Sequence, residues 1–219
     1  MYKNYLLIGV FVFVKFTFAQ NTYSDHYYKL KAQFERTPDT ENEIIFLGNS
    51  ITEGGNWDEL FPDINAVNRG ISGDVTDGII NRLKEVTSSK PLKIFLLIGT
   101  NDLAREKSVS EITDNYRTII EKIQEQSSNT KIYIQTVLPV NPYVGRKFAG
   151  HKSRQMDIIA LNKNLKSMAS DFHIQFINLY EPLANAKKHL KPKYTHDGLH
   201  LSAKGYKKWA EQIEQYVYE

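Results

Sequence analysis

Five short runs of β-branched and aromatic apolar residues recur along the chain and strongly limit the folds open to it. They cover residues 44–47, 66–68, 94–98, 132–137 and 174–179. Each run is apolar throughout instead of alternating with polar residues, which is typical of parallel strands covered on both faces. Helix-length segments separate the runs. The chain is therefore expected to form an open α/β sandwich around a five-stranded parallel sheet, with right-handed crossovers.

Two intervening segments and the last stretch of the chain have the pattern of amphipathic helices. Apolar residues fall three and four apart at Ile112, Tyr116, Ile119, Ile120 and Ile123, and again at Met156, Ile159, Leu161 and Leu165. The final segment, 203–217, follows Ser202, a residue type favoured as a helix cap. Each segment is expected to pack its apolar side against the sheet.

Residues 1–19 are expected to be a secretory signal peptide. Lys3 precedes an apolar stretch from 5 to 14, and Ala19 offers a cleavage site. The stretch is short for a membrane span and Lys15 follows it closely, so a retained anchor is the less favoured alternative. The chain has no cysteine, which excludes a cysteine-linked lipid and disulfides. An exported protein, periplasmic or secreted and without a stable membrane anchor, is predicted.

Length and charge set further limits on the part after the signal peptide. Residues 20–219 are enough for a single domain, and they contain no repeat or low-complexity tract. The formal charge of +3 falls to about +1 when Lys3 and Lys15 are removed. A nearly neutral domain offers no electrostatic reason to bind nucleic acid, so no nucleic-acid partner is expected.

Polar segments follow the predicted strands at the edge where ligands gather in such sheets. Ser50 follows the first strand, residues 70–74 the second, Asn101 the third and residues 139–151 the fourth. Asp197 and His200 lie on a separate loop before the last helix. Each of these residues alone also fits a cap, a turn or a surface position. Their common placement favours one site.

The residue types at this edge match the needs of a serine nucleophile. Ser50 requires a base to accept its proton, and a histidine such as His200 suits that task near neutral pH. Asp197 would fix the histidine tautomer. The available oxyanion donors are the backbone amides of Ser50 and Gly73 and the side-chain amide of Asn101. Gly73 is expected to adopt a positive φ.

Four sequence blocks carry a resemblance to a known family. They read GNSIT at 48–52, NRGISGD at 68–74, GTND at 99–102 and DGLHLS at 197–202. In residue type and order the chain resembles the SGNH hydrolases, or GDSL-type esterases and acylhydrolases, from about residue 43 to its end. The resemblance implies a flavodoxin-like three-layer α/β/α sandwich and acyl-ester or thioester hydrolysis without metal or cofactor. One departure is Asn49, where the family usually has aspartate.

A metal site is the rival interpretation of the last block. His196 and His200 are four residues apart, which is faintly similar to a zinc-binding His-Glu-x-x-His helix. Gly198 interrupts any helix there, the glutamate is missing, and no third ligand stands nearby in the sequence. No metal is therefore expected, and His196 is interpreted as a neighbour of the pocket or a surface residue.

The loop after the fourth strand is the candidate substrate-binding segment. Tyr143 and Phe148 could stack on a sugar ring, and three basic residues could meet an anion, although a solvated basic turn explains them equally: Arg146, Lys147 and Arg154. The predicted function is an exported serine esterase that removes short acyl groups, acetyl above all, from a small ester such as an acetylated sugar. The alternatives are a lysophospholipase or thioesterase of the same family, and an inactive glycan-binding module.

Overall fold

The computed structural model describes residues 23–219, and the predicted signal peptide at 1–19 lies outside them. Five strands form one sheet in the order β2-β1-β3-β4-β5, and every neighbouring pair is parallel. This is the order of flavodoxin-like sheets. The predicted fold class is confirmed. The strands are β1 (Ile44–Gly48), β2 (Ala66–Gly70), β3 (Lys93–Leu97), β4 (Lys131–Gln135) and β5 (Gln175–Ile177).

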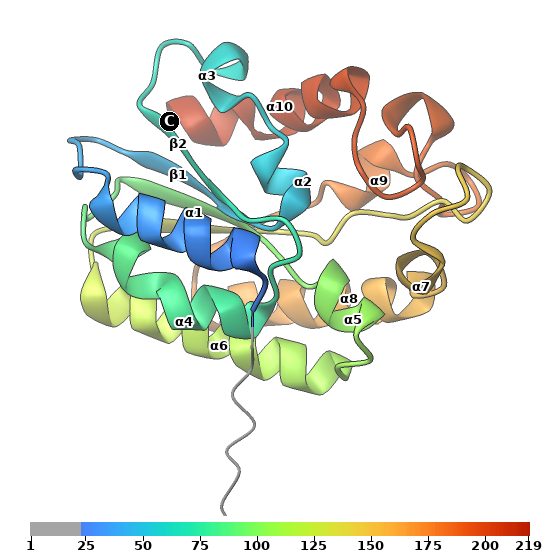
Figure 1. Ribbon diagram of the computed structural model, residues 1–219, viewed down its shortest axis with the longest axis horizontal. Helices are drawn as coiled ribbons and strands as arrows, with labels where there is room; N and C mark the ends of the chain where they lie inside the picture. The colour runs from blue at the N-terminus through green and yellow to red at the C-terminus, as the bar shows by residue number, and fades with distance from the viewer. Residues whose placement is uncertain (1–22) are drawn as a thin grey trace, which may run out of the picture.

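Helices cover both faces of the sheet (Figure 1). One layer contains α1 (Asp25–Arg36), α4 (Thr76–Thr87), α6 (Val109–Gln126) and α8 (Gln155–Asp171). The other contains α3 (Trp57–Leu60) and α10 (Ala203–Tyr218). The short elements are α2 (Ser50–Glu53), α5 (Thr100–Ala104), α7 (Ala149–Lys152), α9 (Tyr180–Leu183) and the 3₁₀ turn η1 (Pro192–Tyr194). Among residues 23–219, no helix combines the length and the apolar character that a membrane crossing requires.

An aromatic stack runs across one face of the sheet. Phe46, Phe95 and Tyr133 occupy paired positions on β1, β3 and β4, so their side chains share that face. Their ring centroids are 5.3 Å apart for Phe46 and Phe95 and 4.5 Å apart for Phe95 and Tyr133. Trp57 of α3 stacks on Phe46 at 4.0 Å, and Trp209 of α10 meets Trp57 edge-on at 4.8 Å. These contacts attach α3 and α10 to the sheet.

Two strands are shorter than the sequence predicts. β4 ends at Gln135 and β5 at Ile177, although apolar residues continue beyond both. Thr136 explains the change of direction, because its Oγ1 accepts hydrogen bonds from the backbone amides of Leu179 and Tyr180, each at 2.9 Å. The Thr136 side chain thus takes the place of the backbone hydrogen bonds that would extend the pairing of β4 and β5, and both strands end at this point.

The buried face of α8 also differs from the prediction. Met156 and Ile159 are 73% and 37% exposed and do not belong to the core. The residues that pack inward are Ile158, Leu161, Leu165, Met168 and Ala169. Apolar residues occur on two sides of this helix, so spacing alone selected the wrong starting positions. The last helix begins as predicted, with the Ser202 side chain accepting from the amide of Gly205.

Candidate active site

Ser50, His200 and Asp197 form one hydrogen-bonded chain. Ser50 Oγ lies 3.1 Å from His200 Nε2, and His200 Nδ1 lies 2.8 Å from Asp197 Oδ2. Ser50 opens α2 directly after β1, whereas Asp197 and His200 lie between η1 and α10. The fold thus brings together a hydroxyl and an imidazole that are 150 residues apart in sequence.

Hydrogen-bonding capacity fixes the tautomer of His200. Burial would raise the pKa of Asp197, but hydrogen bonds from the His200 ring and from the amides of Leu199 and His200 lower this pKa below its ordinary value. Asp197 is therefore ionised near neutral pH and can only accept. Because the Asp197 carboxylate must receive a proton-bearing Nδ1, Nε2 of the neutral imidazole is free to accept from the Ser50 hydroxyl.

The loop that carries Asp197 and His200 is closed on itself by Thr195. Thr195 forms an antiparallel bridge with Leu201. Its Oγ1 donates to the carbonyl of His200 at 2.7 Å and accepts from the amide of Gly198 at 2.9 Å. The separation between carboxylate and imidazole is therefore set by local backbone structure.

Asn49 holds the turn that presents Ser50. Its side chain is fully buried, and Oδ1 accepts from the amide of Ile51 at 3.0 Å, which caps α2. An aspartate at this position would offer the same acceptor. The departure from the usual residue therefore preserves the cap. Among the described residues, Asn49 Nδ2 is buried without a hydrogen-bond partner.

The loop after β2 is attached to the segment that carries Ser50. The amide of Ile71 donates to the carbonyl of Gly48 at 3.1 Å, and the amide of Ser72 donates to the carboxylate of Glu53 in α2. Gly73 has a φ of +81°, as predicted. A Cβ there would approach only Arg105 Nη2, at 3.8 Å. Backbone conformation, and not crowding by these described atoms, favours glycine at this position.

Asn101 lies in α5, directly after β3. Its Nδ2 donates to the carbonyl of Asp74 at 2.8 Å. The next residue, Asp102, is fully buried and accepts from the amide of Thr76 at 3.0 Å, so the turn after β3 is bound to the start of α4. Nδ2 carries a second hydrogen that can donate to a negatively charged oxygen. This edge therefore combines a serine hydroxyl, a base with its carboxylate, and an amide donor.

Comparison with known proteins supplies the family. A sequence profile of the GDSL-like lipase/acylhydrolase family matches residues 46–208, which contain all four blocks. The chain belongs to this family. Platelet-activating factor acetylhydrolase IB subunit alpha2 of Rattus norvegicus is 26% identical over 186 residues, covering 82% of this chain and 77% of the relative.

Solved structures agree with this assignment. A candidate platelet activating factor from Streptococcus pneumonia is 30% identical with a TM-score of 0.82, covering 88% of this chain and 93% of that one. A GDSL-like lipase from Bacteroides thetaiotaomicron is 25% identical with a TM-score of 0.76, covering 88% and 97%. The protein is a carboxylic ester hydrolase of the GDSL type.

A buried arginine connects two loops of this GDSL hydrolase. Arg82 of α4 places Nε 2.9 Å from Asp74 Oδ2, and its Nη2 donates to the carbonyls of Gly48 and Arg69 at 3.3 and 2.8 Å. Its Nη1 lies 2.9 Å from Glu85 Oε1. Burial raises the pKa of Asp74 to about 6, although Arg82 opposes the shift. Arg82 thus ties the turn before Ser50 to the loop of Gly73.

The loop after β4 is packed against the loop of Asp197. The amide of Asn141 donates to the carbonyl of Gly198 at 2.8 Å. Lys152 is buried, and its Nζ donates to three carbonyls: Val144 at 2.9 Å, Gly145 at 3.0 Å and Asp197 at 3.4 Å. Gly198 has a φ of +90°, and a Cβ there would lie 2.3 Å from the Asn141 carbonyl oxygen, so close packing requires glycine.

The two predicted aromatic residues occupy different environments. The Phe148 ring meets the His200 ring edge-on, with centroids 5.0 Å apart. Phe148 also has a φ of +62°, an unusual conformation for a bulky residue that tertiary contacts must hold. Tyr143 is 81% exposed, and its ring meets the His189 ring edge-on with the centroids 5.4 Å apart. The structure therefore brings Phe148, and not Tyr143, against the Ser50–His200–Asp197 chain.

The predicted basic residues are likewise separated. Arg146 and Lys147 are exposed. Arg154 lies 3.3 Å from Glu106 and 3.6 Å from Asp157, so its charge is balanced locally. A different cation contacts the Gly73 loop, because Arg105 Nη2 donates to the carbonyl of Gly73 at 2.8 Å. The sequence signal for Arg105 was its position just after the GTND block.

Sequence reasoning also missed three polar residues that contact this site. His151 Nε2 lies 2.9 Å from Asn101 Oδ1, and Arg82 and Lys152 make the contacts described above. For His151 and Lys152 the signal was the presence of a histidine and a lysine in the loop after the fourth predicted strand, where ligands are expected to bind. For Arg82 the signal was an arginine three positions before Glu85 in a helix-length segment between two predicted strands.

Asp197 supplies the third ligand that the sequence interpretation lacked, so His196, Asp197 and His200 could together hold a metal ion. Each offers one ligand atom, and these atoms lie within 4.8 Å of one another. Two nitrogens and an oxygen are suitable ligands for Zn²⁺. Asp197 and His200 are already hydrogen-bonded to each other, so a metal ion would compete for the side chains that form the Ser50–His200–Asp197 chain. His196 adds only an exposed ring stacked 6.3 Å from that of His200.

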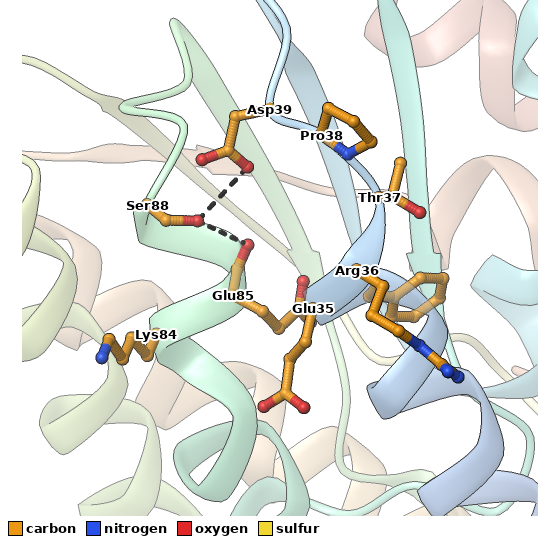
Figure 2. A pocket seen from close by; sticks show the side chains of 9 residues that line it. Glu35, Arg36, Thr37, Pro38, Asp39, Lys84, Glu85 and Ser88 are labelled. Carbon is orange, nitrogen blue, oxygen red and sulfur yellow. Dashed lines mark hydrogen bonds between the residues drawn. The ribbon is translucent and has the colours of Figure 1, made fainter.

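A separate hollow of about 500 Å³ lies between the ends of α1 and α4 (Figure 2). Ser88 Oγ bonds there to Asp39 and to the carbonyl of Glu85, each at 3.3 Å. The lining mixes acidic and basic side chains, including Glu35, Arg36 and Lys84. The C-terminal ends of α1 and α4 lead into β1 and β3. The hollow therefore lies at the amino ends of the strands, whereas Ser50 lies at their carboxyl ends.

Proposed function

We propose that this hydrolase is an exported serine esterase that removes short acyl groups, acetyl above all, from carbohydrate. Ser50 is the nucleophile, His200 the general base and acid, and Asp197 the residue that orients His200. The amides of Ser50 and Gly73 and the side chain of Asn101 donate to the oxyanion. No cofactor has a role in this proposal.

The observation that carries the proposal is the continuous hydrogen-bonded chain from Ser50 through His200 to Asp197, at 3.1 and 2.8 Å. Nε2 of His200 accepts the Ser50 proton while Oγ bonds to the ester carbonyl carbon, whose oxygen becomes the oxyanion. His200 then protonates the departing alcohol. Water repeats the sequence on the acyl-enzyme and releases the carboxylic acid.

Four observations support the short-acyl, sugar and export parts of the proposal. The rat relative is an acetylhydrolase. The loop after β4 presents the exposed Arg146 and Lys147 beside Phe148, whereas a long acyl chain needs a continuous apolar groove. An aromatic ring beside His200 suits the apolar face of a sugar. Export rests on the signal-peptide pattern of residues 1–19.

The primary test is hydrolysis of p-nitrophenyl acetate by the wild type and by Ser50→Ala. The wild type should turn over, and Ser50→Ala should lose nearly all activity while keeping its thermal unfolding. Residual catalysis of about 10³–10⁴ over water can remain in triad enzymes that lack a member. Unchanged turnover in Ser50→Ala would refute the nucleophile. A wild type without turnover would favour the glycan-binding module.

Substrate and export need separate tests. We expect higher kcat/KM for acetyl than for octanoyl esters and release of acetate from acetylated sugars. A preference for octanoyl esters, lysophospholipids or thioesters would instead support those alternatives. Arg146→Ala should raise KM selectively for an acetylated acidic sugar, because this exposed cation would meet the carboxylate. An unchanged KM for that sugar would refute this part of the proposal. For export, the mass of the protein recovered outside the cytoplasm should correspond to a chain beginning at Gln20.

A further inference from the structure

His151 contacts the amide of Asn101 from the opposite side to Asp74. His151 lies in α7 and is half-buried, with Nε2 2.9 Å from Asn101 Oδ1. It takes no part in the Ser50–His200–Asp197 chain. The segment after β4 therefore contributes a side chain directly to a proposed oxyanion donor.

The partners of Asn101 decide how its amide is oriented. The carbonyl of Asp74 can only accept, so the group that faces it at 2.8 Å must be Nδ2. Oδ1 then faces His151, and because Oδ1 can only accept, His151 Nε2 must carry the proton. One hydrogen of Nδ2 is occupied by Asp74, and the geometry of the planar amide fixes the direction of the other.

His151 is itself held in place. The Phe148 ring packs edge-on against both imidazoles, with its centroid 5.7 Å from that of His151 and 5.0 Å from that of His200. The next residue, Lys152, fastens the same helix to the Val144 and Gly145 carbonyls. Burial, followed by the charges of His200 and Arg105, lowers the pKa of His151. The ring is therefore neutral near pH 7.

We propose that His151 is a positioning residue that holds the Asn101 amide in the orientation required to donate to the oxyanion. The inference rests on the proposed function of Asn101. Loss of one oxyanion donor costs about 10²–10³ in kcat. Loss of the residue that orients the donor should cost part of this, about tenfold or more, with little change in KM.

The first experiment measures kcat and KM for p-nitrophenyl acetate in two matched variants. His151→Gln can place an amide N–H near the position of Nε2, whereas His151→Asn is too short to reach Oδ1. We expect the Gln variant to retain most of the wild-type kcat and the Asn variant to lose about tenfold or more. His173→Asn, at an exposed histidine just before β5, is the control and should retain kcat. Equal kcat in the Gln and Asn variants would overturn the proposal.

The second experiment asks whether His151 acts through Asn101. His151→Asn is introduced into the wild type and into Asn101→Ala, and the two effects on kcat are compared. We expect the His151 change to have almost no effect when the Asn101 amide is absent. Equal effects in both backgrounds would show that His151 acts elsewhere. If Asn101→Ala alone retains wild-type kcat, the proposed role of Asn101 fails, which is a different result.

Discussion

Arg82 Nε lies 2.9 Å from Asp74 Oδ2, and neither side chain is exposed to solvent. The same guanidinium pairs with Glu85 and donates to the carbonyl of Gly48, two residues before Ser50. One side chain thus supports both the turn before Ser50 and the loop of Gly73. Its loss would leave the buried Asp74 carboxylate without its ion-pair partner, whereas Glu85 would keep Arg69, whose Nε lies 2.9 Å from Glu85 Oε2.

Arg82→Met is expected to lower the free energy of unfolding by about 3–5 kcal/mol, the usual cost of breaking a buried ion pair from one side. Urea denaturation near neutral pH measures the change. Lys84→Met is the matched control, because Lys84 is exposed on the same helix, and it should change the value by less than about 0.5 kcal/mol. Equal losses in both variants would contradict the prediction.

Asp74 gives a pH dependence of stability with a defined sign. Burial raises its pKa from 3.8 to about 6, against the opposing effect of Arg82. Between these values the folded protein retains a proton that the unfolded chain releases, so the contribution of Asp74 to the free energy of unfolding decreases as pH rises.

Asp74→Asn removes this titration. The free energy of unfolding of the wild type minus that of the variant should therefore fall between about pH 4 and about pH 6.5. Urea denaturation at both values measures the difference. A difference that increases with pH would show that Arg82 outweighs burial.

The fold was predictable because its central strands β1 and β3 are fully buried, so residues such as Ile45, Phe46 and Phe95 stand out in continuous apolar runs. The strand ends were not. β4 stops where Thr136 binds the amides of Leu179 and Tyr180, a contact between segments that no local pattern encodes.

The proposed site residues divide in the same way. Ser50 and Asn101 closely follow strands, and Asp197 and His200 share a short motif, so chain order identifies them. His151, Arg82 and Lys152 acquire their importance from partners far away in sequence, at separations of 50 for His151–Asn101 and 45 for Lys152–Asp197. Such pairings depend on how the loops meet in the folded protein.

Asp197→Asn is expected to lower kcat by about 10⁴, because asparagine no longer fixes the tautomer that leaves Nε2 free. In the wild type, kcat/KM should rise with pH between about 5 and 8, because only a neutral His200 can accept the Ser50 proton. The lowered pKa of Asp197 keeps it ionised there, so it adds no second step. The measurement is a pH profile from about 5 to 8 on p-nitrophenyl acetate. A flat wild-type profile, with chemistry rate-limiting, would be inconsistent with this base.

Phe148→Ala and Tyr143→Ala form a matched pair from one loop. Phe148 packs edge-on against His200, and aromatic pairs of this kind contribute about 0.5–1.5 kcal/mol. Phe148→Ala should therefore lower kcat about two- to tenfold through a less ordered imidazole. Tyr143 is 81% exposed, so its replacement should leave p-nitrophenyl acetate hydrolysis unchanged. Larger losses for Tyr143→Ala than for Phe148→Ala would reverse this order.

Metal dependence separates the serine mechanism from the metal alternative. Every step of the proposed mechanism has a protein group to perform it, so EDTA should leave the rate unchanged. Added Zn²⁺ should inhibit, because ligand atoms of His196, Asp197 and His200 lie within 4.8 Å of one another. A bound Zn²⁺ would engage Asp197 and His200 and so disrupt their hydrogen-bonded chain with Ser50. His196→Ala should then keep the basal rate and need more Zn²⁺ for the same inhibition. Activity that is lost in EDTA and restored by Zn²⁺ would favour a metal centre over the Ser50 nucleophile.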